Sequence, residues 1–410
     1  MAILLETFEL LVLVPIAFLL LYLVTLSVLA LSARKELKGS AARLRRFAVV
    51  VPAHNEETAI ERTLHSLMDL DYPRDLFSVI VIADNCTDRT AEIAGGLGAE
   101  VLVREDPTQR GKGYALRLAF DRLLAPELRY DGVVVIDADT AASRDCLSVL
   151  NRFLARGAVS IQSCDIVKPQ PDAWSSEVTR LGFALYNHVR PLGRSVIGCS
   201  AGVRGNGMCF AAETLKRYPW GAFSITEDLE YGLHLLLHGV VTAFAPEAKV
   251  YATMPRDADN ARSQRGRWEG GRLPVLKKYA GHLLGMAVRR GSFKHFDAVV
   301  DLVTPPLVNL LAIVVAMTCV NIVLAAFGVS PAVPLMLFCL LLLVMGVGHM
   351  LTGLLAIKAD RNLFRAVWYI PRYALWKLRL YRGMLAGGSE KEWVRTAREA
   401  SASKSPVHLG

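Results

Sequence analysis

Four short polar blocks hold the side chains of this sequence that could do chemistry. They are Asp84-Asn85, Asp137-Ala138-Asp139, Thr226-Glu227-Asp228 and Gln264-Arg265-Gly266-Arg267-Trp268. The first two follow the apolar runs 79–83 and 133–136, which predict buried strands. Acidic residues at strand ends are suited to a site that holds a divalent cation and a diphosphate near one sugar carbon.

Strand and helix patterns alternate between residues 47 and 140. Strands are predicted at 47–52, 77–83, 99–103 and 132–137, and helices at 57–70, 87–95 and 113–124. This order predicts an α/β domain with a mostly parallel sheet and helices on both faces. Ligands bind outside the carboxyl ends of the strands in such sheets. We therefore expect residues 52–56, Asp84 and residues 137–139 to meet at one crevice.

The stretch after residue 140 is less regular. Helices are predicted at 174–189 and 229–237, and capping alone could explain an acid such as Asp228 in a first helical turn. No Gly-x-Gly-x-x-Gly follows a strand, and Arg110-Gly-Lys-Gly113 is not a Walker loop. Lys112 is left with two interpretations, a phosphate contact or a solvated helix entry.

Cysteine and histidine spacing gives no support for a metal centre. The seven cysteines form no Cys-x-x-Cys pair, and we interpret each as a small buried residue that stays reduced in the cytoplasm. His234 and His238 have i, i+4 spacing on a predicted helix. A zinc site would need a further ligand that the sequence does not offer.

Three apolar segments are long enough to cross a membrane. The chain is 53% hydrophobic with a mean hydropathy of +0.33, and residues 10–31 are 22 residues without a charge, enough for a hydrocarbon core of ~30 Å. Residues 302–357 contain no Asp, Glu, Lys or Arg, and residues 328–334 divide them into arms of 26 and 23 residues. A cleaved signal peptide is the weaker alternative for the first segment, because its leader lacks Lys and Arg but carries Glu6 and Glu9.

Basic residues gather beside these spans at 33–46 and 358–386. Lys and Arg beside membrane spans favour the cytoplasmic side. A topology of one span, a large domain and two further spans puts both basic clusters on that side. We therefore expect a multi-pass protein of the inner membrane with its main domain in the cytoplasm. The net charge of +9 is then mostly close to the membrane, and a nucleic-acid-binding surface is the less favoured explanation.

These patterns divide the chain into seven segments. They are an N-terminal transmembrane helix (1–32), a basic juxtamembrane linker (33–46), a catalytic domain (47–269), interfacial amphipathic helices (270–301), a transmembrane hairpin (302–357), a basic aromatic interfacial helix (358–386) and a polar tail (387–410).

The order of the polar blocks resembles that of the membrane-integrated family-2 glycosyltransferases, the group of cellulose, chitin and hyaluronan synthases. Residues 264–268 match the family's Gln-x-x-Arg-Trp motif, residues 226–228 its Thr-Glu-Asp motif and residues 137–139 its Asp-x-Asp motif. The similarity runs from about Arg46 to Trp268. It implies a GT-A fold, which is a Rossmann-like domain that binds a nucleotide sugar, and an inverting β-glycosyltransferase that uses Mg²⁺ or Mn²⁺.

The resemblance also implies roles for single residues. It places Asp84 at the uridine, Asp137 at the ribose and diphosphate, and Asp139 at the metal ion, with Asp228 as the general base. Donor binding would be completed by Pro52, Ala53, Asn55, Gln264 and Arg267, with Lys112 beside phosphate, and acceptor binding would involve Trp268, Glu227 and Asn206. Independent chemistry agrees, because a cation and a guanidinium stabilise a leaving diphosphate and a carboxylate can deprotonate an acceptor hydroxyl.

The sequence does not identify the acceptor, but a polysaccharide or oligosaccharide at the inner face of the membrane is placed first and a membrane lipid is the alternative. The donor implied by the resemblance is a UDP-hexose or a UDP-N-acetylhexosamine. Three spans are fewer than a polymer channel needs, which leaves a poly- or oligosaccharide, an oligomeric synthase, or one sugar transferred to a membrane lipid. A binding scaffold without turnover is less favoured because it would not need Asp228. A transporter is least favoured, because three spans without membrane-buried acidic or basic residues offer no substrate path.

Overall fold

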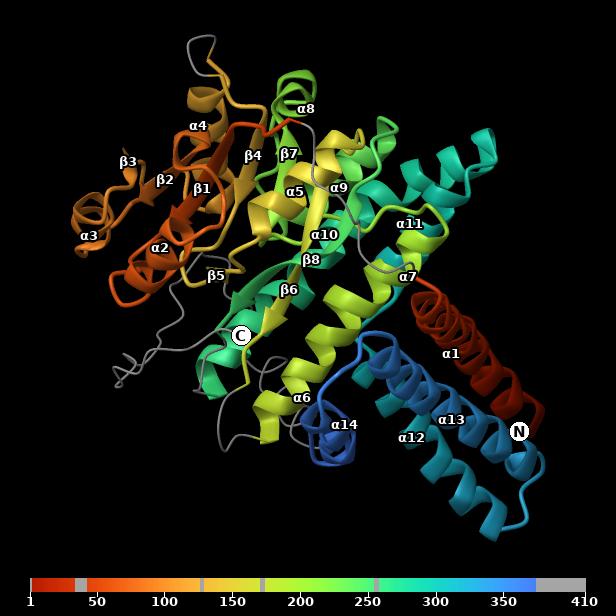
Figure 1. The fold of residues 1–410 in the computed structure, drawn as a ribbon. Helices are drawn as coiled ribbons and strands as arrows, with labels where there is room; N and C mark the ends of the chain where they lie inside the picture. The colour runs from red at the N-terminus through yellow and green to blue at the C-terminus, as the bar shows by residue number, and fades with distance from the viewer. Residues whose placement is uncertain (1, 34–42, 126–128, 170–173, 254–257, 374–410) are drawn as a thin grey trace.

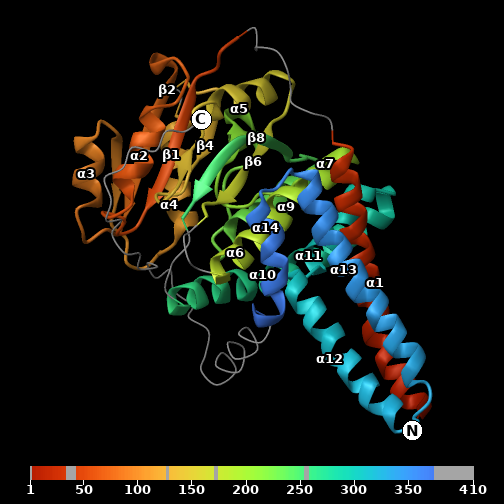
Figure 2. The same cartoon turned by 60° about the horizontal axis from the view of Figure 1, so that its bottom comes forward.

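The computed structural model describes residues 2–33, 43–125, 129–169, 174–253 and 258–373, with only the backbone of residues 2–5, 174–175 and 258–269. An α/β domain is joined to a bundle of long helices that points away from the sheet (Figures 1 and 2). The strands are β1 (Phe47–Ala53), β2 (Phe77–Asp84), β3 (Glu100–Arg104), β4 (Gly132–Val135), β5 (Ala141–Ala142), β6 (Ser160–Val167), β7 (Met208–Ala211) and β8 (Ala243–Ala252).

The helices fall into two groups along the chain. Those of the α/β domain are α2 (Ile60–Met68), α3 (Thr90–Gly96), α4 (Lys112–Leu123), α5 (Cys146–Ala155), α6 (Trp174–Phe183), α7 (Arg190–Val196), α8 (Ala212–Arg217) and α9 (Glu227–Leu237), with a π-helical segment at Ala184–Val189. The others are α1 (Ala2–Leu31), α10 (Ala258–Arg290), α11 (Phe293–Val303), α12 (Leu307–Ala326), α13 (Ala332–Ala356) and α14 (Arg361–Ala366).

The described strands form one mixed sheet in the order β3-β2-β1-β4-β7-β6-β8-β5. β3, β2, β1 and β4 are parallel, which confirms the sheet predicted from residues 47–140. β7 runs antiparallel to both β4 and β6, and β8 pairs in parallel with β6. The antiparallel β7 comes from the stretch whose sequence pattern is too irregular to predict it.

Both faces of β1 are buried, each in a different apolar core. Phe47, Val49 and Val51 belong to a core that includes α2 and α5, whereas Ala48 and Val50 belong to a core that includes α4 and α9. Successive strand residues point to opposite faces, so a strand covered by helices on both sides needs a continuous apolar run. This explains why residues 47–51 are uninterrupted by polar residues.

Several element ends differ from the sequence-based prediction. α2 begins at Ile60 rather than at residue 57, because residues 57–59 form a turn that is closed by a hydrogen bond of 2.9 Å from the Ala59 N–H to the Glu56 carbonyl. β4 ends at Val135, two residues early, because Asp137 already starts a turn closed by the Thr140 N–H. The helix predicted to end at residue 189 continues as α7.

Three described helices are long and apolar enough to cross a membrane. They cover Glu6–Leu31, Leu307–Ala326 and Ala332–Ala356, at the positions predicted. α1, α12 and α13 run side by side (Figure 2) and share a core that includes Leu20, Val314 and Leu342. Large apolar side chains such as Leu11 and Val344 face outward and are exposed. Such a surface marks contact with a membrane or a partner.

The first of these helices corrects one expectation. It extends past Leu10 to include Glu9, which is 2% exposed and accepts a hydrogen bond of 2.7 Å from Asn321 Nδ2 of α12. An acid is therefore buried among the apolar helices, contrary to the prediction of none. The Asn321 amide lets the carboxyl be buried without losing all of its hydrogen bonds.

The interfacial segment predicted at 270–301 is part of two helices that pack on the α/β domain. α10 already begins at Ala258, and α11 turns two acids inward. Asp297 Oδ2 lies 2.7 Å from Arg194 of α7, and Asp301 also pairs with that guanidinium. These ion pairs attach α11 to the α/β domain.

The contact between α1 and α7 generates a stability prediction. Gly193 of α7 lies against the Leu26 carbonyl of α1, so a Cβ there would overlap the backbone of α1. We expect Gly193→Ala to destabilise the protein by about 1–3 kcal/mol, the usual range for overpacking. The midpoint of thermal unfolding in detergent should fall.

Gly285→Ala is the matched control for this substitution. Gly285 lies inside α10, and no atom lies within 4 Å of the place where its Cβ would stand. Alanine there should be neutral or stabilise by up to ~1 kcal/mol, because it favours the helix. Equal midpoints for the two variants would contradict the close α1–α7 contact.

Candidate active site

One cavity of about 880 Å³ begins at the carboxyl ends of β1 and β4 and continues to the apolar helices α12 and α13. At the sheet it is lined by Pro52, Asp137 and Asp139. Farther along it is lined by Asp228 and then by residues of α12 and α13. The position follows the rule that open α/β sheets bind ligands where parallel strands end.

The Asp137-Ala138-Asp139 block forms the turn after β4. Ala138 is buried, and its carbonyl accepts a hydrogen bond of 2.7 Å from the Thr63 hydroxyl of α2. The Asp137 N–H donates to Asn206 Oδ1 at 3.2 Å. With Ala138 held inward, the residues on either side of it both line the cavity and remain partly exposed.

Lys112 supplies a buried positive charge next to this turn. Its Nζ lies 2.5 Å from Asp137 Oδ1, 2.6 Å from the Gly205 carbonyl oxygen and 4.0 Å from Glu227 Oε1. Burial alone would lower the pKa of Lys112, but the carboxylates of Asp137 and Glu227 raise it above its ordinary value. Lys112 therefore stays charged and is not a solvated helix entry.

Glu227 and Asp228 lie in the first turn of α9. Glu227 is buried and Asp228 is partly exposed in the cavity. Burial is the main cause that raises the pKa of both carboxyls, with the Asp228 charge adding to the rise at Glu227 and Asp137 adding to it at Asp228. A carboxylate with a raised pKa is a stronger proton acceptor, which suits a general base.

The loop before β7 approaches Asp228 closely. Gly205 has a φ of +79°, and a Cβ there would lie 2.9 Å from Asp228 Oδ2, so the loop needs glycine at this point. Asn206 is buried, and its Nδ2 donates to Thr140 Oγ1 at 3.1 Å and to Asp165 Oδ1 at 3.2 Å. Its amide thus holds the acidic turn in place, while its predicted role toward the acceptor stays a prediction.

Asp165 of β6 is a residue that sequence analysis missed. It is 8% exposed and lines the cavity. Burial, and then the charges of Asp137 and Asp139, raise the pKa of Asp165 to about 8. The carboxyl is therefore mostly protonated at pH 7. An acid inside the buried strand 160–167 was the available signal, because acids are almost never fully buried unless paired.

Asp84, Ala53 and Asn55 lie behind the cavity and are not among the described residues that line it. Asp84 is fully buried, and its Oδ1 lies 2.7 Å from Arg104 while its Oδ2 has no hydrogen-bond partner. Asn55 Oδ1 accepts a hydrogen bond of 2.7 Å from the Thr87 N–H. These contacts fix the loops after β1 and β2, and a direct contact of Asp84 with a base stays a prediction.

Gln264, Arg267 and Trp268 lie in α10, but their side chains are outside the described residues. Their predicted roles toward the diphosphate and the acceptor are therefore untested. Arg272 and Leu273, farther along the same helix, line the cavity. α10 thus passes beside the site.

The acidic end of the cavity fits a divalent cation bound together with phosphate. Among the described residues, no group of three or more His, Cys, Asp or Glu side chains is arranged to hold a metal ion alone. Mg²⁺ is usually bound by one or two carboxylates, with water and substrate phosphates completing its shell. Asp139 is partly exposed in the cavity. A cation there would offset the repulsion that contributes to the raised pKa of Asp165.

A mixed sheet with carboxylates at the ends of its parallel strands fits an α/β domain of the GT-A fold. Sequence comparison narrows the class. Residues 45–271 match the family described as glycosyltransferase like family 2. The chain belongs to that family and is a glycosyltransferase.

Curated relatives and a solved structure agree with this assignment. The chain is 27% identical over 284 residues to the beta-monoglucosyldiacylglycerol synthase of Nostoc sp., covering 66% of this chain and 57% of that protein. It is 29% identical over 176 residues to the 4,4'-diaponeurosporenoate glycosyltransferase of Staphylococcus aureus, covering 42% of this chain and 44% of that protein. The chain thus spans about half the length of these curated relatives.

A mannosyltransferase of Pyrobaculum calidifontis, solved with GDP-Man and Mn²⁺, has the same fold. It superposes with a TM-score of 0.57 and 17% identity, over 87% of this chain and 99% of that chain. The superposed part of this chain includes both the sheet domain and a large part of the remaining helices.

The raised pKa of Asp165 generates a prediction about pH. The carboxyl titrates near 3.9 in an unfolded chain and near 8 in the folded one, so it lowers stability progressively as pH rises from about 4 to 8. Asp165→Asn keeps the shape of the protonated acid and removes this loss. In EDTA, its thermal midpoint should exceed that of the unmodified protein by at least about 2 °C at pH 8 and by less at pH 5.

Asp75→Asn provides the control for general charge removal. Asp75 is exposed, so its substitution should leave the midpoint nearly unchanged at both pH values. An Asp165→Asn variant whose gain does not grow with pH would show that this carboxyl is ionised in the folded protein.

Proposed function

We propose that the protein transfers one sugar from a nucleoside diphosphate sugar to the hydroxyl group of a membrane lipid. The observation that carries this proposal is the continuity of the cavity. It extends from Asp139 and Asp228 in the α/β domain to Leu311 of α12 and Met350 of α13. A lipid headgroup can therefore reach the acidic site while its chains stay among the apolar helices.

The lining of the cavity's membrane end favours an acyl chain over a sugar polymer. Apolar side chains make up much of this lining. They come from α6, the π-helical segment, α12, α13 and the end of the described chain, and they are Leu181, Leu185, Leu307, Leu311, Met350 and Ile370. Burying a methylene group stabilises a complex by about 0.8 kcal/mol. A polysaccharide would gain little from such a surface because its hydroxyl groups would lose water.

The names of two relatives support the same acceptor class. One is a monoglucosyldiacylglycerol synthase and the other a diaponeurosporenoate glycosyltransferase. The polysaccharide acceptor that sequence analysis placed first has less support, because three candidate spans offer only a short bundle for the passage of a polymer. We therefore place the lipid acceptor first.

The proposed reaction is a single displacement at the anomeric carbon. Asp228 takes the proton of the lipid hydroxyl as its oxygen attacks the carbon from the face opposite the diphosphate, which inverts that carbon. Lys112 keeps its positive charge at the acidic turn, and Gln264 and Arg267 would contact the departing diphosphate. Mg²⁺ or Mn²⁺ held by Asp139 would stabilise negative charge on the diphosphate. A UDP-hexose or UDP-N-acetylhexosamine donor with an α-linked sugar would thus give a β-linked product.

The proposed location is the cytoplasmic side of the inner membrane. Basic residues dominate the charge at 33–46 and 358–386, next to the first and third candidate spans. Such clusters favour the cytoplasmic side. The α/β domain between them would then face the cytoplasm.

Substitution of the proposed base tests the function directly. Purified protein is incubated with Mn²⁺, labelled UDP-sugars and bacterial lipids, and the label is partitioned between butanol and water. We expect label in butanol for the unmodified protein and a loss of roughly 10²–10⁴-fold in Asp228→Asn, the usual contribution of a general base. UDP binding by calorimetry should be retained.

Three results would overturn this proposal. A ladder of water-soluble products would identify a polysaccharide acceptor. Unchanged transfer by Asp228→Asn would remove Asp228 from the mechanism. No UDP release from any donor would argue against a UDP-sugar-dependent reaction as a whole.

Narrowing the cavity tests the acceptor path separately from the chemistry. Gly182 of α6 lines the cavity and has open space where a Cβ would stand. In Gly182→Trp the indole should exclude several lipid methylenes, which raises the KM for the lipid by roughly tenfold or more. Hydrolysis of the donor without acceptor should not change.

Gly182→Ala serves as the small-volume control. It adds one methyl group and should leave the KM for the lipid within about twofold, because a single methyl excludes little of the chain. If Gly182→Trp transfers sugar with an unchanged KM, the lipid does not pass through this part of the cavity.

A further inference from the structure

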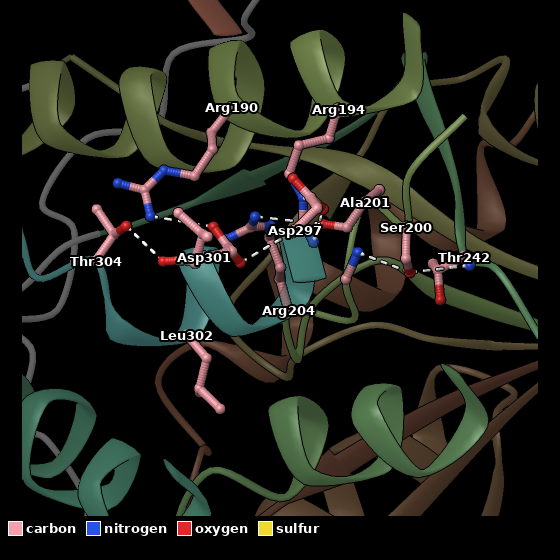
Figure 3. A network of polar contacts seen from close by, with 12 residues as sticks. Arg190, Arg194, Ser200, Ala201, Arg204, Thr242, Asp297, Asp301, Leu302 and Thr304 are labelled. Atoms are coloured by element: carbon pink, nitrogen blue, oxygen red, sulfur yellow. Dashed lines mark hydrogen bonds and ion pairs between the residues drawn. The ribbon is translucent and has the colours of Figure 1, made fainter. Parts of the chain in front are cut away.

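A cluster of charged side chains lies on the membrane side of Asp228. It consists of Arg190 and Arg194 of α7, Arg204 of the loop before β7, and Asp297 and Asp301 of α11 (Figure 3). Arg272 of α10 completes it through contacts with the backbone of α11. Four guanidinium groups thus face two carboxylates, so the cluster has an excess of two positive charges. Four of its members, Arg190, Arg204, Arg272 and Asp301, line the cavity.

Two of the arginines join helices to one another through contacts with protein groups. Arg194 lies 2.7 Å from Asp297 Oδ2 and 2.9 Å from Asp301 Oδ2, and it is 2% exposed. Arg272 donates to the backbone carbonyls of Asp301 and Leu302. These contacts attach α7 and α10 to α11, so we assign both side chains a structural role.

The other two arginines keep hydrogen-bonding capacity. Arg190 is 4% exposed and contacts Asp301 Oδ1 at 3.2 Å, while its Nε has no partner. Arg204 donates at 3.3 Å to the Ala201 carbonyl, and its Nε is also buried without a partner. Both guanidinium groups stack on the ring of Tyr186, at 4.8 and 4.2 Å from its centroid. A buried donor without a partner costs free energy unless a ligand supplies one.

Tyr186 reports the sign of the potential in this part of the cavity. Burial would raise the pKa of its hydroxyl, but the charges of Arg272 and Arg204 lower it below its ordinary value. The two aspartates of the cluster therefore do not balance its arginines at this point.

We infer that Arg190 and Arg204 bind an anionic group, a phosphate or a carboxylate, on the lipid acceptor. Guanidinium groups form short, charge-assisted hydrogen bonds with such oxygens. Arg204 directly precedes Gly205, where an added Cβ would lie 2.9 Å from Asp228 Oδ2, and Arg204 and Asp228 line the same cavity. An anion held by Arg204 is therefore in the cavity of the proposed base. This inference rests on the proposed lipid acceptor and narrows it to anionic lipids that carry a free hydroxyl.

Binding without turnover tests the inference. Detergent-purified protein is titrated with dioctanoyl phosphatidic acid and, separately, with neutral dioctanoylglycerol, and the bound fraction is measured by native mass spectrometry. We expect tighter binding of the phosphatidic acid. Arg204→Gln should weaken that binding by roughly tenfold or more and leave binding of dioctanoylglycerol unchanged. Arg204→Lys should give an intermediate loss because it keeps the charge but not the planar pair of donors.

Arg361→Gln controls for loss of positive charge near the membrane. Arg361 is exposed on α14 and does not line the cavity. An equal loss in Arg361→Gln and Arg204→Gln, or equal binding of the two lipids by the unmodified protein, would overturn the inference. Loss of UDP binding in Arg204→Gln would also overturn it, because the guanidinium would then serve the donor.

Two further measurements distinguish a lipid headgroup from a free anion, and the anion site from the proposed function. Displacement of phosphatidic acid by millimolar inorganic phosphate would assign the site to a free anion rather than to a lipid headgroup. Asp228→Asn should bind phosphatidic acid normally. If the lipid binds as expected but no sugar reaches any lipid, the proposed function fails while the anion site stands.

Discussion

The ammonium group of Lys112 is the interaction on which the site depends. It contacts Asp137 after β4, the carbonyl of Gly205 before β7, and Glu227 at the start of α9. These segments lie far apart in the sequence, and their carboxylates would repel one another in the low-dielectric interior without a cation between them. Even with Lys112 present, Glu227 and Asp228 keep raised pKa values. One lysine therefore holds the turn, the loop and the helix together but does not neutralise the cavity.

Sequence analysis predicts best those parts of the site that depend only on residues adjacent in the sequence. A strand ending in Asp137-Ala138-Asp139 gives both the strand and the position of its carboxylates, since only adjacent residues are involved. Asp165 could not be located in this way. It reaches the site because β6 pairs with β7 and β7 with β4, two antiparallel pairings that no local pattern specifies. Its raised pKa exists only once that sheet has formed.

The same limit applies to the membrane-proximal helices. Composition predicts three apolar helices, but it cannot predict that Asp297 turns inward to meet Arg194 and the hydroxyl of Tyr22. These contacts join α7, α11 and α1, while the hydrogen bond of 2.6 Å between Ser27 and His349 joins α1 to α13. The distance between the acidic site and the apolar helices is thus fixed by buried polar contacts. Those contacts are long-range in sequence, and no local pattern specifies which residues form them.

The cavity is electrostatically divided along its length. Carboxylates dominate at the sheet, where Asp165 is protonated near neutral pH, and guanidinium groups dominate toward the apolar helices, where Tyr186 has a lowered pKa. Under the proposed function, the anionic diphosphate of the donor would meet a field of its own sign at the sheet end, and a cation would favour its binding there. An anionic lipid entering from the membrane end meets the opposite sign and needs none. Binding of the donor should therefore depend on a divalent cation, whereas binding of the acceptor should not. The reason is that the two ligands approach Asp228 from ends of the cavity with opposite charge.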